Sequence, residues 1–207
     1  MRLVPYEKAY IDHLAGVVRL SVDLPVGQPL PPSAQSKSLL NRMWRALKLD
    51  RNLYEEVEHD ENASKQVIVV IGLVSIAQAI GLSLTNRILG EGLTRILVRG
   101  VLEFVITLVG LVIWSYLVYL VGTRLFKGVA TQQETWRTAG FARSPGVFFV
   151  VPFVGLFVNI WLIIAQVIAV REALDVPTGR AILTCIISFI PYVLLLGMVE
   201  ILLATFI

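Results

Sequence analysis

The amino-acid sequence predicts an all-α polytopic membrane protein, with five transmembrane helices preceded by a cytoplasmic N-terminal arm and an amphipathic interfacial helix. Composition is the first reason, because 56% of the 207 residues are hydrophobic and 16% are charged. Soluble domains are about half apolar and roughly a quarter charged. The second reason is pattern, because four apolar stretches approach the roughly 20 residues that cross a bilayer. They cover residues 67–84, 100–122, 147–170 and 181–207.

Three parts follow one another along the chain. Residues 1–36 form a polar arm that ends in the proline-rich linker PVGQPLPPSAQS, a composition typical of extended segments. Residues 37–64 hold amphipathic helices outside the membrane core, the second of them capped by Asp50. The first of these helices either lies in the headgroup region or packs on the membrane domain. Its apolar residues at helical spacing are Leu39, Leu40, Met43, Trp44 and Leu47. Residues 65–207 form the transmembrane domain.

The stretch at 147–170 is ambiguous because Pro152 and Gly155 interrupt it. Either one kinked helix spans it, or Pro152 marks a turn between two helices. Flanking charge favours the turn, since five helices with a cytoplasmic N-terminus put nine cations inside and three outside, in line with the positive-inside rule. The nine are Lys48, Arg51, Lys65, Arg124, Lys127, Arg137, Arg143, Arg171 and Arg180, and the three are Arg87, Arg95 and Arg99. The predicted spans are approximately 66–84, 99–122, 135–151, 154–172 and 180–205.

Three sequence blocks flank these spans in a characteristic order. They read RMWRALKLDRNLYEEVEHDENASKQVIVV before the first span, GTRLFKGVATQQETWRTAGFARSPG after the second and AVREALDVPTGRAI between the fourth and fifth. Over about residues 40–205 the chain resembles the Yip1 family, its bacterial members in particular. The middle block carries most of the resemblance, through Gly122, Gly128, Thr131, Thr135, Arg137, Gly140, Phe141, Ala142 and Pro145.

The resemblance implies a five-helix Yip1 domain with a cytosolic N-terminus. It also implies a link to vesicle trafficking and small GTPases in eukaryotic relatives, and no particular biochemical role in bacterial ones. Residues 1–36 lie outside the resemblance. The turn at Pro152 is shorter than the glycine- and proline-rich connection expected for the family.

Four polar residues lie inside the predicted spans, where polar side chains are costly. They are Gln78, Glu103, Asn159 and Glu200. Each lies roughly 5–10 Å inside the outer boundary, by the rise of a helix. Together they form a predicted intramembrane polar layer in which the two carboxylates share a proton, bind a cation or pair with arginine. The alternative is that the glutamates reach the interface separately while the amides bond neighbouring helices.

Arg143 lies about two turns inside the predicted third helix. Three interpretations remain open: it reaches back to the cytoplasmic surface, neutralises a headgroup phosphate, or pairs with Glu134. Small residues and prolines predict helix packing and kinks rather than a substrate passage. These candidates are Gly140, Pro145, Gly146, Pro152 and Pro191. The predicted basic cytoplasmic rim comprises Arg42, Arg45, Lys48, Arg124, Lys127, Arg137, Arg143, Arg171 and Arg180.

The sequence lacks the usual marks of an enzyme. The predicted spans contain no histidine or aspartate for intramembrane proteolysis, and nucleotide-binding and nucleophile motifs are missing. The acidic run EEVEHDE at 55–61 fixes no metal geometry, and the single Cys185 allows no disulfide within the chain. We therefore predict no catalytic residue, cofactor, metal site, soluble substrate or nucleic-acid partner.

The remaining interpretation is a non-enzymatic membrane scaffold or accessory subunit. It would associate with partner membrane proteins or anionic lipid through helix faces and the N-terminal arm. Two alternatives stay open: a small transporter or permease component that uses the carboxylate layer, and a membrane-trafficking or lipid-handling factor. The expected location is the bacterial inner (plasma) membrane, with a cytoplasmic N-terminus and a non-cytoplasmic C-terminus.

Overall fold

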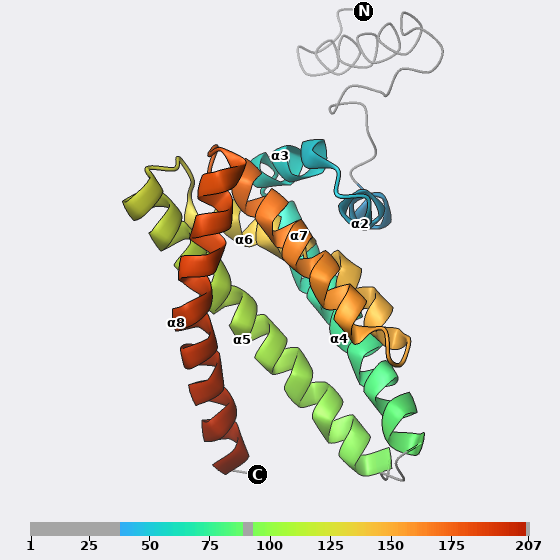
Figure 1. Ribbon diagram of the computed structural model, residues 1–207. Helices are drawn as coiled ribbons and strands as arrows, with labels where there is room; N and C mark the ends of the chain where they lie inside the picture. Colours follow the sequence, from blue (N-terminus) through green and yellow to red (C-terminus); the bar gives the residue numbers. More distant parts are fainter. Residues whose placement is uncertain (1–37, 89–92, 206–207) are drawn as a thin grey trace, which may run out of the picture. The chain divides into compact units, whose positions relative to one another are not determined.

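The computed structural model describes residues 38–88 and 93–205, and helices account for most of this part of the chain (Figure 1). In chain order they are α2 (Leu39–Leu47), α3 (Arg51–His59), α4 (Ala63–Ile88), α5 (Leu93–Phe126), α6 (Gln132–Phe141), the 3₁₀ helix η2 (Ser144–Val150), α7 (Gly155–Ala173) and α8 (Thr178–Thr205). No strand occurs among the described residues, in agreement with the predicted all-α class. The predicted arm at 1–36 lies outside the described residues.

Four of the helices are long and apolar enough to cross a membrane. Their apolar parts are Ala63–Thr85, Phe104–Phe126, Gly155–Ala173 and Thr178–Met198. At 1.5 Å per residue these parts are about 28–35 Å long, which matches a hydrocarbon core of about 30 Å. The chain is therefore an integral membrane protein, with helices over four of the five predicted spans.

The remaining predicted span, 135–151, is not one continuous helix. The α-helix α6 ends at Phe141, and the chain continues as the 3₁₀ helix η2, with Pro145 in its first turn. A proline inside an α-helix removes one backbone donor and clashes with the preceding turn, so the break falls just before it. End to end, α6 and η2 would extend about 30 Å. The count of five transmembrane helices therefore stays a prediction. We call α6 and η2 together the composite segment, which covers the third of the five predicted spans.

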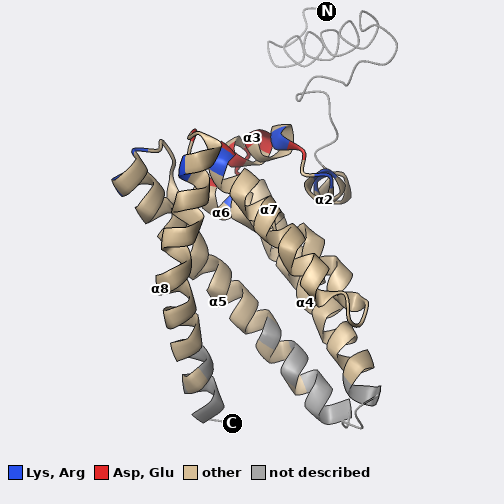
Figure 2. Ribbon diagram, in the orientation of Figure 1, with Lys and Arg blue, Asp and Glu red and all other residues tan. Residues whose placement is uncertain are grey.

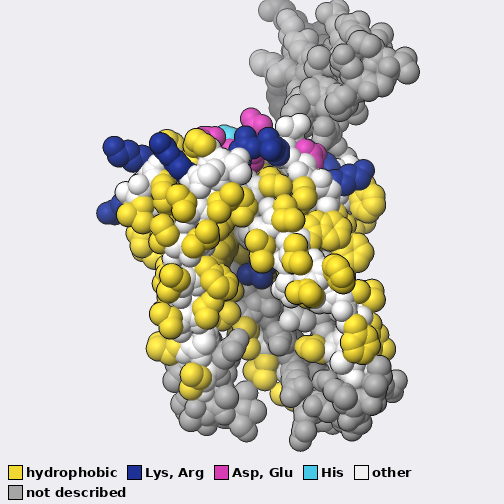
Figure 3. Space-filling view, in the orientation of Figure 1, with side chains coloured by type: hydrophobic (Ala, Val, Ile, Leu, Met, Phe, Trp, Pro, Cys, Tyr) yellow, Lys and Arg dark blue, Asp and Glu magenta, His cyan; other side chains and the backbone are white. Residues whose placement is uncertain are grey.

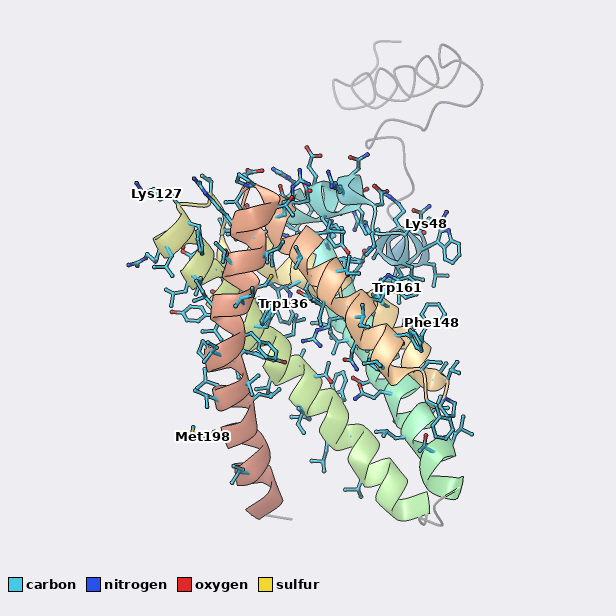
Figure 4. All side chains as sticks on the ribbon, in the orientation of Figure 1. Lys48, Lys127, Trp136, Phe148, Trp161 and Met198 are labelled. Atoms are coloured by element: carbon cyan, nitrogen blue, oxygen red, sulfur yellow. The ribbon has the colours of Figure 1, made fainter. Side chains whose placement is uncertain are left out.

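The turn at Pro152 decides between the two interpretations of residues 147–170. The chain turns between η2 and α7, and Phe153 adopts a left-handed backbone conformation with φ of 70°. Across this turn the Phe148 and Trp161 rings stack, with centroids 5.5 Å apart and an interplanar angle of 15° (Figure 4). The segment is a helical hairpin, and the single kinked helix is wrong.

The buried core combines small and β-branched side chains with larger ones such as Tyr54 and Phe141, and its glycines let the helices approach closely. A Cβ added to Gly140 would lie 2.3 Å from Val67 Cγ1, and one added to Gly146 would lie 2.6 Å from Val74 Cγ1. At these two glycines α6 and η2 therefore lie directly against α4, while their packing role stays a prediction. Pro191, also predicted as a kink, lies inside α8 without ending it.

Charged side chains gather at one end of the helical body, where α2 and α3 lie (Figure 2). We call this the charged end. It comprises α2, α3, the beginnings of α4, α6 and α8, and the ends of α5 and α7. The ends of α5 and α7 meet there, because Val129 N–H donates to the Leu174 carbonyl at 3.1 Å. Below it, hydrophobic side chains cover most of the described surface in view (Figure 3).

Candidate functional site

The helix α2 is attached to the charged end by the buried side chain of Arg42. Its exposed fraction is 0%. The Nε and Nη2 atoms donate to Glu56 Oε1 at 3.0 and 2.8 Å, and Nη2 also donates to Asp60 Oδ2 at 2.6 Å. The Nη1 atom donates to Gln66 Oε1 at 2.8 Å. One guanidinium thus joins α2 to α3 and to the beginning of α4 through charge-assisted hydrogen bonds.

Arg45, one turn further along α2, makes a second attachment. Its Nε donates to Asp50 Oδ2 at 2.7 Å and its Nη1 donates to Glu56 Oε2 at 2.5 Å. Burial lowers the pKa of Arg45, but the hydrogen bonds to Asp50 and Glu56 outweigh it, so the pKa is raised. The two oxygens of Glu56 therefore serve two arginines, and breaking such a buried pair typically costs about 3–5 kcal/mol. We call Arg42, Arg45, Asp50, Glu56, Asp60 and Gln66 the clamp.

A second buried cluster lies between α3 and α6. Arg137 is buried, and its Nη2 donates to the backbone carbonyl of Glu58. The Glu58 carboxylate is buried too, with Oε1 3.3 Å from His59 Nδ1 and Oε2 without a hydrogen-bond partner among the described residues. Burial raises the pKa of Glu58 to about 7; the His59 charge opposes this, and the Asp175, Glu134 and Glu55 charges add to it.

A polar chain crosses the apolar body below the charged end. Trp114 Nε1 donates to Gln166 Oε1 at 2.9 Å, and Gln166 Nε2 donates to the Ala139 carbonyl at 3.0 Å. The Trp114 ring also meets the edge of Tyr192, with centroids 5.3 Å apart. One amide therefore joins α5, α6 and α7. Sequence reasoning passed over Gln166, although an amide in the middle of an apolar stretch was an available signal.

The model of the Yip1 domain matches residues 51–199, which is more than half of the chain.

The chain belongs to the Yip1 family.

This confirms the resemblance found in the sequence. Searches of curated proteins and of solved structures find no match to this chain. The Yip1 domain begins at α3 and ends within α8, so α2 precedes it. The clamp therefore ties a segment outside the domain to residues inside it.

In the structure, some cations of the predicted basic rim are buried and others are exposed. Arg42, Arg45 and Arg137 face the protein interior, as described above. Lys48, Arg124, Lys127 and Arg180 are exposed at the charged end. Arg171 is half-buried, with Nε 3.6 Å from Glu172 Oε1. The surface that cations offer to a partner is therefore smaller than the sequence suggested.

Arg143 is half-buried where α6 meets η2, and its Nε is buried without a hydrogen-bond partner. Glu134, one of its predicted partners, is used elsewhere. The Glu134 carboxylate accepts from Thr131 N–H at 2.7 Å in a capping box that begins α6. The other two interpretations of Arg143 stay predictions.

The predicted polar layer is described only in part. Asn159 is exposed, and its Nδ2 donates to the Gly155 carbonyl of the same helix at 2.8 Å. Gln78 is half-buried. The side chains of Glu103 and Glu200 lie outside the described residues, so the layer remains a prediction.

Proposed function

We propose that this Yip1-family chain is a non-enzymatic scaffold or accessory subunit that binds partner membrane proteins inside the bilayer, chiefly through α8. One observation carries the proposal. Only 17% of the apolar part of α8 is buried within the chain, compared with 39% for each of the other three apolar helices. The helix thus has the largest surface left for neighbours.

The exposed face of α8 is a continuous apolar stripe. Ile186, Ile190, Leu194 and Met198 follow one another at intervals of four residues, and all are exposed; Figure 4 shows Met198 on α8. Gly197 lies beside this stripe, and a Cβ added there would meet nothing within 4 Å. A glycine in a helix interior costs about 1 kcal/mol relative to alanine. No neighbour within the described chain is close enough to need a glycine at position 197. A transmembrane helix of a partner that packed closely here would need one.

The polar side chains of the membrane body support a structural role. Thr184 Oγ1 donates to the Arg180 carbonyl at 2.8 Å, and Ser115 Oγ donates to the Val112 carbonyl at 3.0 Å. Gln166 joins three helices, as described above. These three groups bond inside the protein, in line with a structural role, whereas the buried Ser75 and Ser188 hydroxyls have no hydrogen-bond partner among the described residues.

The test compares two substitutions of open glycines. Gly197→Leu should abolish co-purification of a stoichiometric partner from native membranes in mild detergent, because the leucine side chain keeps the partner helix away. Gly179→Leu is the matched control, since a Cβ at Gly179 also meets nothing within 4 Å. It lies at the beginning of α8 and should leave the partner bound. Purification of the unmodified chain as a lone monomer would contradict the proposal.

A further inference from the structure

An apolar groove lies between α2, α4 and η2. Its volume is about 470 Å³, and it is open on one side rather than enclosed. Its lining consists of apolar side chains: Leu40, Met43, Trp44 and Leu47 of α2, Leu73, Ile76, Ala77 and Ile80 of α4, and Val147 and Val150 of η2. The side chain of Ala77 is smaller than those of the other α4 residues that line the groove, and this leaves space in the groove wall.

The groove opens outward rather than into the core. Leu40 and Trp44 are 74% and 58% exposed, and Ile76 on the facing wall is 60% exposed. In an integral membrane protein such a surface meets lipid. The clamp holds α2 in place over the groove, because Arg42 and Arg45 point to the opposite side and form ion pairs there with Asp50, Glu56 and Asp60.

The ammonium group of Lys48 lies at the edge of the groove, beside Trp44. Lys48 Nζ lies 5.0 Å from the centroid of the Trp44 ring, on the exposed side of α2 (Figure 4). Lys48 follows the last residue of α2, whose end is fixed by hydrogen bonds from Leu49 N–H to the Ala46 carbonyl and from Asp50 N–H to the Arg45 carbonyl. The structure records no ion pair of Lys48 with a described carboxylate, and the Asp50 carboxylate is bound by Arg45.

The chemistry of the groove excludes an extended peptide as its occupant. An extended peptide, whether from a partner or from residues 1–37, would bring backbone N–H and C=O groups against a lining that offers no partner for them. Burying such groups unpaired costs several kcal/mol each. A hydrocarbon chain carries no such penalty.

We propose that the groove binds one acyl chain of an anionic membrane phospholipid, whose headgroup phosphate contacts Lys48. The apolar walls take the chain, Trp44 lies at the boundary between chain and headgroup, and the unpaired ammonium supplies the preference for negative charge. This deepens the anionic-lipid part of the function expected from the sequence by naming its site and ligand. It rests on the scaffold being membrane-embedded and not on the association through α8.

The test is native mass spectrometry of the full-length chain in detergent. Dioleoyl-phosphatidylglycerol and dioleoyl-phosphatidylcholine are added separately at equal concentration. The phosphatidylglycerol adduct should predominate. Lys48→Gln should weaken that adduct roughly fivefold, the effect of one cation near a membrane surface, and leave the phosphatidylcholine adduct unchanged. Ala77→Phe should reduce both adducts, because the ring fills the groove.

Two controls and one independent measurement keep the outcome decisive. Lys127→Gln, which removes an exposed cation elsewhere at the charged end, should change neither adduct. Gly197→Leu should also leave lipid binding intact, so that failure of partner association and failure of lipid binding are distinguishable. Phosphatidylglycerol with a photoreactive diazirine in its acyl chain should label α2, α4 or η2, a readout that does not depend on Ala77→Phe folding. Equal losses in Lys48→Gln and Lys127→Gln, or labelling confined to α8, would overturn the proposal.

Discussion

At the scale of single residues, buried charge distinguishes Glu58 from the other carboxylates of α3. Glu56 accepts hydrogen bonds from two arginines, whereas the one cationic group beside Glu58 among the described residues is His59, and one Glu58 oxygen has no hydrogen-bond partner there. Burial therefore raises the pKa of Glu58 to about 7 from an ordinary value of 4.5. When the pKa of a carboxyl group is higher in the folded than in the unfolded state, the folded protein binds more protons. The free energy of unfolding of the protein therefore falls as pH rises.

Glu58 therefore makes the free energy of unfolding depend on pH between about pH 4.5 and pH 7. The stabilisation is fully present below the unfolded pKa and is lost as pH rises through the folded pKa. Replacing Glu58 by glutamine should remove this loss, so that the variant is more stable than the original chain at pH 8 by about 1–2 kcal/mol. Thermal unfolding in detergent at pH 5 and pH 8 measures the difference.

The matched control for this substitution is Glu61→Gln, because Glu61 is exposed and is not among the charges that shift the pKa of Glu58. It should not alter the pH dependence. His59 has a pKa raised chiefly through its bond to the Glu55 carbonyl, which persists in both variants, whereas the smaller contribution of the Glu58 charge is lost in Glu58→Gln. An unchanged pH slope in Glu58→Gln would show that the carboxylate is ionised without cost in the folded protein.

At the scale of elements, the contact between α4 and η2 depends on glycine. A Cβ added to Gly81 would lie 1.8 Å from the Phe149 carbonyl oxygen. A side chain can rotate away from such a clash, but a backbone oxygen moves only if η2 moves. The composite segment therefore packs on α4 at Gly81, where only a residue without a side chain fits.

Gly81→Ala should consequently destabilise the protein by about 1–3 kcal/mol, the usual cost of overpacking. Gly197→Ala should not destabilise it, because the added methyl group meets nothing within 4 Å and alanine favours a helix. Thermal unfolding of both variants in the same detergent provides the comparison. Equal unfolding temperatures would mean that η2 adjusts without cost.

At the scale of the whole helical body, the path of the chain constrains the composite segment. The ends of α5 and α7 meet at the charged end, where α8 also begins. Because α7 returns to the charged end, α6 and η2 must carry the chain away from it. This arrangement supports the five-span topology but also allows a hairpin that enters and leaves on one side.

Cysteine labelling distinguishes these two topologies. In a Cys185→Ser background, Lys127→Cys and Phe153→Cys both place a thiol at an exposed position. If α6 and η2 cross the bilayer, a membrane-impermeant maleimide should modify the two thiols from opposite sides of the membrane. Labelling of both from the same side would show a re-entrant hairpin and four spans.

Local signals explain which predictions the sequence supported. Apolar length identified the membrane class and four helices, because it depends on neighbouring residues only. Pro152 left two interpretations open, and the distribution of cations along the chain favoured the turn before α7. The Asp50 cap was predictable because it too depends on neighbouring residues only, and its side chain accepts from Asn52 N–H at 3.0 Å. The burial of Arg42, Arg45 and Arg137 within the predicted basic rim was not predictable, since nothing in the local pattern tells an exposed arginine from a buried one.

The sequence alone therefore determined an integral membrane protein of the Yip1 family and the order of its apolar segments. Only the tertiary structure decided that Arg42 and Arg45 turn inward to Glu56, that Gln166 bridges to Trp114, and that α6 gives way to η2. The partners of Arg42 and Trp114 lie 14 and 52 residues away in the sequence. Contacts over such separations depend on how helices pack, and the period of a single helix carries no information about its neighbour.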